Sequence, residues 1–219
     1  MLFVNFKTYK ESSGESALEL LFEIESASRE SGVKVVVAVS AADIREATTT
    51  SSLEVWAQHV DAVDFGPHTG AILPEAVLAD GAMGTFLNHS EKRFSDKKVL
   101  SELIARCRKI NLKTLVFAGD LKELKDILEF RPDFVSYEPP ELVGSKYVSV
   151  AQAKPVVIAE AVEMAHASRI PLVVGAGIKE REDIKVSVAL GADGVVVASD
   201  IVLARDPKKE ALELLEGFK

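Results

Sequence analysis

Short apolar runs alternate with amphipathic segments along the whole chain. Eight runs, such as KVVVAVS and GVVVASD, are almost continuously apolar and rich in β-branched residues. This pattern is typical of strands that are covered on both faces in a parallel sheet. The predicted strands are residues 2–6, 34–40, 55–60, 84–88, 114–118, 134–138, 172–175 and 194–198.

The segments between the predicted strands have the period of helices. Apolar residues recur at three- and four-residue spacing, which gives a helix one apolar face. Ser95 is a candidate N-cap, and Pro155 and Pro207 fall in a first helical turn, where a missing N–H leaves no hydrogen bond unmade. The clearest predicted helices are residues 16–28, 95–110, 121–130, 154–168 and 207–218.

Eight strand–helix units predict a closed (β/α)8 barrel, built as one domain over residues 1–219. No linker rich in Gly, Ser or Pro divides the chain. Barrels of this kind usually have about 250 residues, so the loops of this 219-residue chain should be short. A doubly wound open sheet is the alternative fold. It should carry a glycine-rich fingerprint after its first strand, and VNFKTYKES carries none.

Charge and cysteine content narrow the classes of function. A net charge of -8 argues against binding to nucleic acid, whose phosphates attract clustered Lys and Arg. No apolar run reaches the roughly 18 residues of a membrane span, and the N-terminus shows no export signal. Cys107 is the single cysteine, and His59, His68 and His166 show no metal-ligand spacing. We therefore expect a cytoplasmic protein with no membrane partner, no nucleic-acid partner and no metal site.

Polar residues stand at the carboxyl ends of the predicted strands, where such barrels carry their active sites. Asn5 and Lys7 alternate across one aromatic residue, so both side chains should face the same way. His89 follows the fourth strand. Glu138 ends the sixth strand and precedes two prolines, which hold it in extended geometry. Taken singly, each of these could equally be a solvated side chain at the rim.

Small residues end the last two strands. GAGI (175–178) and ASD (198–200) would let a ligand approach backbone N–H groups, although small residues also permit tight packing. Barrels often build a phosphate site after these two strands. A lysine, a histidine that can be neutral and a carboxylate, opposite a phosphate site, together predict proton transfer beside the carbonyl of a small phosphorylated compound.

Six motifs resemble those of the triosephosphate isomerase family in its short, archaeal-type form. They are NFKTY (5–9), HTG (68–70), NHSEKR (88–93), YEPPELVG (137–144), GAGI (175–178) and VVVAS (195–199). The resemblance implies interconversion of dihydroxyacetone phosphate and glyceraldehyde 3-phosphate through an enediolate, without a cofactor, as a step of glycolysis and gluconeogenesis. It also implies that Asn5 and Lys7 contact the substrate, that His89 is the electrophile and that Glu138 is the catalytic base.

The resemblance assigns further residues to a lid, a phosphate site and a subunit contact. Residues 141–150 would form a lid, with Val143 and Gly144 near the phosphate. Glu91 would support the site through an ion pair, and Thr69 resembles the interdigitating loop that reaches a partner subunit. The backbone N–H groups expected to hold the phosphate, without any arginine, are those of Gly144, Gly177, Ala198 and Ser199.

Two expectations follow from neighbouring segments. The loop 65–75 carries Ile72 and Leu73, which a monomer would leave exposed, so we expect a homo-oligomer, either a dimer or a tetramer. The helix that follows His89 should place positive potential near the ring and keep the imidazole neutral.

Two departures from the family pattern concern the lid and the phosphate site. Lys146 stands in the lid where a glycine is common, and Asp200 stands where a glycine is usual. Asp200 should point away from the phosphate, because a carboxylate beside a dianion is repelled. None of the expected catalytic residues is missing.

Other functions stay open on the sequence alone. The chain could be another phosphate-binding barrel, such as an isomerase or synthase acting on a phosphorylated sugar or indole intermediate. A non-catalytic barrel that only binds ligand or assembles should have lost Glu138 or His89, and both are present. A Schiff-base aldolase should carry a lysine near the end of a middle strand, where we find none.

Overall fold

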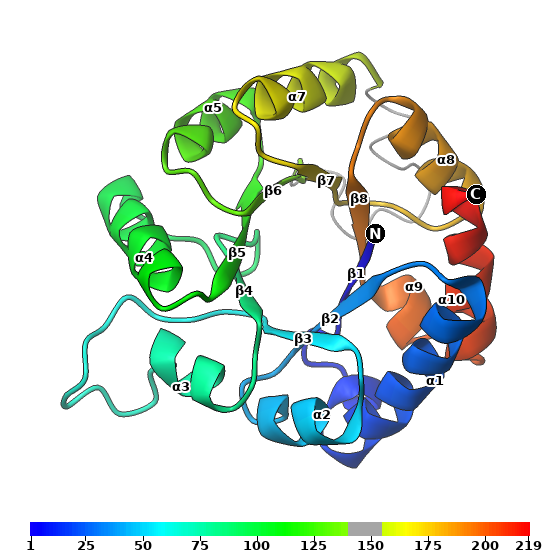
Figure 1. Cartoon of the computed structure of the whole chain (residues 1–219), viewed down its shortest axis with the longest axis horizontal. Coiled ribbons are helices and arrows are strands. Elements are labelled where there is room, and N and C mark those ends of the chain that lie inside the picture. The colour runs from blue at the N-terminus through cyan, green and yellow to red at the C-terminus, as the bar shows by residue number, and fades with distance from the viewer. Residues whose placement is uncertain (140–154) are drawn as a thin grey trace.

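Parallel strands pair in chain order from β1 to β8, and β8 pairs again with β1 to close the ring (Figure 1). The computed structural model describes residues 1–139 and 155–219. The strands are β1 (Leu2–Asn5), β2 (Val35–Val39), β3 (Glu54–Ala57), β4 (Gly84–Leu87), β5 (Lys113–Ala118), β6 (Phe134–Tyr137), β7 (Leu172–Val174) and β8 (Gly194–Val197). The predicted (β/α)8 barrel is therefore confirmed.

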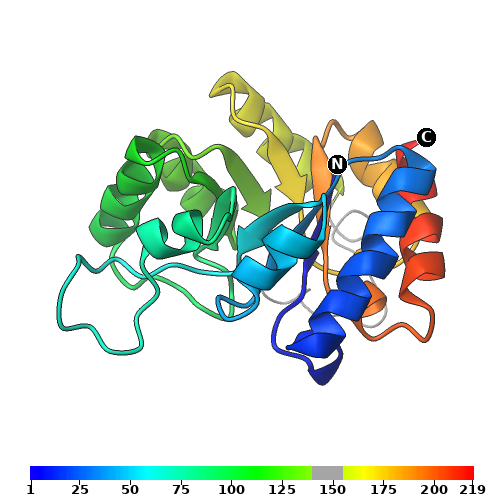
Figure 2. The ribbon, with the colours of Figure 1, turned by 60° about the horizontal axis from the view of Figure 1, so that its bottom comes forward.

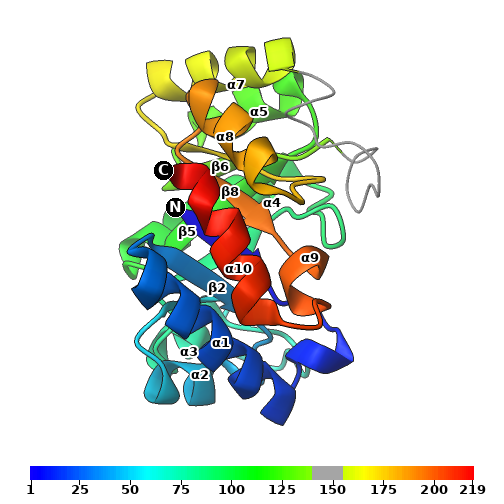
Figure 3. The same cartoon turned by 90° about the vertical axis from the view of Figure 1, so that its right-hand side faces the viewer.

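Helices form a layer outside the ring, and α10 lies between α1 and α8 (Figure 3). The described helices are α1 (Glu15–Ser31), α2 (Ile44–Thr50), α3 (Pro74–Ala79), α4 (Lys97–Lys109), α5 (Leu121–Glu129), α7 (Pro155–Ala167), α8 (Arg181–Ala189), α9 (Ser199–Val202) and α10 (Pro207–Leu215), with single 3-10 turns η1 (Lys10–Ser12) and η3 (Glu216–Phe218). Within this described part, no helix is long and apolar enough to span a membrane.

Most element boundaries differ from the sequence predictions by one to three residues, and two of the differences show their contacts clearly. β3 stops at Ala57 rather than at residue 60, because the chain leaves the sheet there and the Gln58 amide donates to the carbonyls of Lys7 and Ala38 at 2.8 and 3.2 Å. The N-cap of α4 is Asp96 and not Ser95, since the Asp96 carboxylate accepts a hydrogen bond from the N–H of Lys98 at 2.7 Å. A carboxylate at this position also matches the positive end of the helix dipole.

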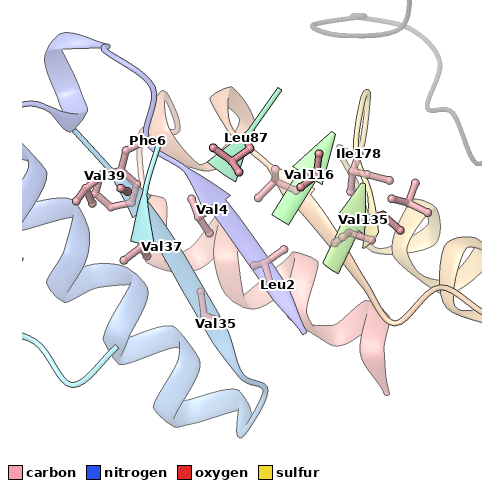
Figure 4. Close-up of a cluster of buried hydrophobic side chains, with 14 of the residues drawn as sticks. Leu2, Val4, Phe6, Val35, Val37, Val39, Leu87, Val116, Val135 and Ile178 are labelled. Carbon is pink, nitrogen blue, oxygen red and sulfur yellow. The ribbon is translucent and has the colours of Figure 1, made fainter. Parts of the chain in front are cut away.

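The larger apolar core fills the space between the strands and the helices. Alternate strand residues point outward into it, as Leu2 and Val4 of β1 do beside Val35 and Val37 of β2 (Figure 4). The apolar faces of the helices cover them, which explains why the strands show no polar alternation in the sequence.

A second core lies inside the barrel. Phe3, Trp56, Phe86 and Phe134 pack edge to face or tilted, with ring centroids 5.4–6.3 Å apart. Gly84 makes room for this cluster, because a Cβ there would lie 2.4 Å from the Trp56 ring. These rings lie within their strands, whereas the polar side chains of the cavity lie at or after the strand ends.

A half-buried carboxylate joins this aromatic cluster to the surface. Glu54 accepts from the indole N–H of Trp56 at 2.9 Å and pairs with Lys34 at 2.6 Å and with Lys113 at 3.1 Å. These three partners outweigh the effect of burial and hold the pKa of Glu54 below its ordinary value. The carboxylate therefore stays ionised at neutral pH, with its acceptors occupied.

Candidate active site

A cavity of ≈ 280 Å³ opens at the carboxyl ends of the strands. It is lined by residues at or after the ends of β1, β4, β6, β7 and β8. Parallel strands place all these ends on one side of the ring, which is how residues far apart in the sequence meet. Seven residues that the sequence analysis selected border it: Asn5, Lys7, His89, Glu138, Gly177, Ala198 and Ser199.

Lys7 reaches the cavity through a turn and not as part of a strand. β1 ends at Asn5, and Lys7 has a positive φ of 51°, with its N–H donating to Asn5 Oδ1 at 3.0 Å. Asn5 and Lys7 thus border the same cavity, as expected. The left-handed conformation of Lys7 brings them together, and not the alternation of side chains along a strand. The Lys7 ammonium lies 2.7 Å from Glu91 Oε1, the ion pair expected for Glu91.

The segment after β4 is fixed by a residue to which the sequence analysis gave no role. Asn88 has a φ of 60°, donates to the Phe117 carbonyl at 2.9 Å and accepts from the Phe94 N–H at 3.1 Å. These bonds set the course of residues 89–94 and direct His89 toward the cavity. Asn tolerates the left-handed conformation better than most residues, which is the signal that the sequence offered.

His89 is buried and its tautomer is set by the backbone. Nδ1 accepts a hydrogen bond from the N–H of Glu91 at 3.2 Å, so the proton of the neutral ring belongs on Nε2. Nε2 faces Glu138 Oε2 at 3.4 Å, without the alignment of a hydrogen bond. The edge of the ring also packs against Phe117.

Burial keeps the imidazole neutral. It lowers the pKa of His89 to about 4, with Glu91 acting in the opposite direction and Lys7 in the same one. The expected neutrality agrees with this, but the expected cause was wrong. A turn follows His89, with the Lys92 N–H donating to the His89 carbonyl at 2.8 Å, and α4 begins only at Lys97.

Glu138 is held at the end of β6 by the N–H that it donates to the Ala118 carbonyl at 2.9 Å. Its side chain is only 6% exposed. Burial raises the pKa of Glu138 to about 7, and the Lys7 cation opposes that rise. A carboxylate with this pKa can accept and return a proton near neutral pH.

The opposite side of the cavity is made of small residues and exposed backbone. Ala176 and Gly177 both have positive φ, 75° and 71°, which turns the chain sharply after β7. Lys179 and Tyr9 also line the cavity, and the sequence analysis assigned neither. Lys179 directly follows the GAGI motif, and this position is the signal that the sequence offered for a basic group at the cavity.

Other selected residues lie away from the cavity or outside the described part. Thr69 is exposed in the loop between β3 and α3, which projects from the barrel (Figure 2). Ile72 and Leu73 are half-buried, contrary to the expected exposure, and Phe65 is the exposed apolar residue of this loop at 73%. The lid 141–150, with Val143, Gly144 and Lys146, lies outside the described residues.

No group of three or more His, Cys, Asp or Glu side chains suited to a metal occurs among residues 1–139 and 155–219.

Comparisons with known proteins cover almost the whole chain. The sequence profile described as "Triosephosphate isomerase" matches residues 1–215. The triosephosphate isomerase of Methanobrevibacter smithii is 41% identical over 217 residues, which cover 98% of this chain and 97% of that protein. That of Methanobacterium bryantii is 40% identical over 220 residues, with 98% and 95% coverage.

A solved structure agrees with the fold. The crystal structure of triosephosphate isomerase from Bartonella henselae superposes with a TM-score of 0.76 over 99% of this chain and 96% of that chain, at 17% identity. This likeness concerns the barrel alone. The profile match and the two relatives show that the chain belongs to the triosephosphate isomerase family.

Proposed function

We propose that this chain is a triosephosphate isomerase, which interconverts dihydroxyacetone phosphate and glyceraldehyde 3-phosphate. One observation carries the proposal: a buried carboxylate with a pKa of about 7 lies 3.4 Å from a neutral imidazole, and both groups line the same small cavity. Such a pair can move a proton between two adjacent carbons while it holds the oxygens of the same substrate.

Glu138 is the proposed base. Its carboxylate removes a proton from the carbon next to the carbonyl, and the electrons of that C–H bond form the enediolate double bond. The same carboxyl group then returns the proton to the neighbouring carbon. Burial supports this role, because a carboxylate stripped of water is a stronger base than one in solution.

His89 and Lys7 are the proposed electrophiles. The Nε2–H of His89 donates to the carbonyl oxygen, and the ring passes the hydroxyl proton of the enediolate from one oxygen to the other, so that the carbonyl forms on the neighbouring carbon. Lys7, held by Glu91 at 2.7 Å, supplies a fixed positive charge, and Asn5 contributes a buried amide beside it. A positive charge and a hydrogen-bond donor fixed in place stabilise the developing oxyanion without reorganisation of water.

The substrate phosphate is proposed to bind at the small-residue side of the cavity. Gly177, Ala198 and Ser199 offer backbone N–H groups there, and Gly144 of the lid would add another. Lys179 lies at the same side and adds a positive charge. The lid residues 141–150 would close over the phosphate and keep water from the enediolate, which could otherwise eliminate phosphate.

Glu138→Gln removes the base and keeps the size of the side chain. We expect kcat to fall by at least about 10²-fold with little change in KM, because a positioned general base contributes that much to the chemical step. A coupled assay in both directions measures it. Glu54→Gln, which changes a half-buried carboxylate bonded to the Trp56 indole N–H and away from the cavity, is the control and should keep kcat within about two-fold. A near-normal kcat of Glu138→Gln would show that Glu138 is not the base.

His89 should show no protonation near neutral pH. Burial lowers its pKa to about 4, so the ring should stay neutral until the pH falls toward that value. A ¹⁵N-histidine NMR titration, with His89→Gln to assign the signal, measures this and also reports the Nε2–H tautomer. A normal titration near pH 6.5, the usual value for histidine, would contradict the electrophile role.

Asp200→Gly tests the phosphate site. Asp200 lines the cavity, and its carboxylate accepts from the Ser199 hydroxyl at 3.4 Å. If backbone N–H groups carry the phosphate and Asp200 points away from it, KM should stay within a few-fold of the parent. A structure with phosphate bound decides the geometry: an anion held chiefly by Arg or Lys side chains would show the proposal to be wrong.

We also propose a homo-oligomer that uses the projecting loop 65–75. The base of the loop is closed by the Ile72 N–H, which donates to Asp61 Oδ2 at 2.8 Å, while Phe65 stays exposed at its far end. Phe65→Glu should shift the mass measured by light scattering toward the monomer. A parent chain that is monomeric and active at micromolar concentration would count against the proposal.

A further inference from the structure

A hydroxyl group without a partner lies inside the barrel, on the strand that carries Glu138. Ser136 is two residues before Glu138, and its side chain is fully buried. Val135 and Tyr137 belong to the core between strands and helices, so Ser136 faces the interior together with Phe134 and Glu138. Among the described residues, Ser136 Oγ has no hydrogen-bond partner.

The carboxylate next to it is also incompletely bonded. Glu138 Oε2 is buried and has no hydrogen-bond partner within the described part of the chain. A buried donor or acceptor that stays unpaired costs free energy, and the large majority of such groups in proteins are paired. Ser136 Oγ and Glu138 Oε2 are two such groups, on successive inward-facing residues. They indicate a hydrogen bond between the two side chains that forms when the carboxylate changes its protonation state or its position.

Gly175 shows that the two oxygens border the same space. A Cβ built on Gly175 would lie 2.7 Å from Glu138 Oε1 and 3.2 Å from Ser136 Oγ. The first distance is too short for a real side chain, and the second is tighter than most real Cβ contacts. The absence of a side chain at residue 175 therefore leaves room in which the carboxylate and the hydroxyl can approach each other.

We propose that Ser136 is a positioning residue for the catalytic base, and that its hydroxyl donates a hydrogen bond to the Glu138 carboxylate when that group is ionised. The proposal rests on the role of Glu138 given above. A serine hydroxyl can rotate to donate, and the carboxylate needs only a small movement over Gly175 to accept. The bond would hold the base in the same place before each turnover.

Two other side chains act on the carboxylate by charge, and one other hydroxyl lies near it. Lys7 acts through its charge and is bound to Glu91, while Glu91 itself repels the carboxylate. His89 Nε2 lies 3.4 Å from Glu138 Oε2 but makes no hydrogen bond to it. Ser90, in the segment after β4, can also donate a hydrogen bond to the carboxylate and so favours its ionised form, and its Oγ, like that of Ser136, has no partner among the described residues. Ser136 differs from Ser90 because it belongs to β6 and keeps its place if that segment moves.

The proposal predicts a change in the titration of Glu138. A hydrogen bond donated to the ionised carboxylate favours that form, so loss of the bond must raise the pKa. We expect Ser136→Ala to move the Glu138 pKa up by about one unit, the shift typical of one hydrogen bond to a charged group. Ser136→Thr keeps the hydroxyl and should keep the parent value.

The measurement is an NMR titration of the protein labelled with ¹³C at the glutamate carboxyl carbons, with Glu138→Gln to assign the signal. Ser187→Ala is the matched control: Ser187 is equally buried, but it lies in α8 and donates to the Asp183 carbonyl at 2.7 Å. It should leave the Glu138 titration unchanged. In the coupled assay, the acid limb of kcat/KM should move up with the NMR value in Ser136→Ala, with KM within about two-fold.

Thermal unfolding separates this role from a structural one. Ser136→Ala removes an unpaired hydroxyl and should leave Tm unchanged or higher, whereas Ser187→Ala should lower Tm. An unchanged Glu138 titration in Ser136→Ala would overturn the proposal. The two proposals can fail separately. If the parent shows no isomerase activity but the Glu138 pKa rises in Ser136→Ala as expected, the proposed function is wrong and the proposed hydrogen bond is supported.

Discussion

The closure of the parallel ring is the constraint on which the rest of the structure depends. β8 pairs with β1 through Leu2, Phe3 and Val4, so the first and last strands become neighbours. Because every strand runs the same way, the carboxyl ends of β1, β4, β6, β7 and β8 surround one cavity. Asn5 and Ser199, almost two hundred positions apart, thus border the same small volume.

Within the ring, apolar side chains form a core, and polar side chains line the cavity. The aromatic rings pack closely in the interior of the barrel. Above them, burial acts on two titratable groups in opposite directions: it raises the pKa of Glu138 and lowers that of His89. The same loss of water thus produces a carboxylate that can hold a proton and an imidazole that holds only one. Both conditions suit proton transfer at neutral pH.

Much of this arrangement could be predicted from the sequence, because it follows from local patterns. Continuous apolar runs predicted the strands. Their positions at the strand ends selected the polar residues Asn5, Lys7, His89 and Glu138, and these four do line one cavity. Their chemical roles remain proposals. The short helices α2 and α3, of seven and six residues, are too short to show a helical period.

What the sequence could not show depends on three-dimensional contacts. The neutrality of His89 comes from burial and not from a helix end, which only the course of the chain after Asn88 reveals. The space over Gly175 is likewise visible only once β6 and β7 are paired. Lys179 lines the cavity because the left-handed residues Ala176 and Gly177 turn the chain before it.

The position of Trp56 has a consequence for optical studies of this protein. It is the single tryptophan of the chain, and it is enclosed by Phe3, Phe86 and Phe134 with its indole N–H bonded to Glu54. The cavity at the strand ends does not include it among its lining residues. The fluorescence emission of Trp56 therefore reports whether the barrel is closed and its interior is free of water. It should not change when substrate binds in the cavity at the strand ends.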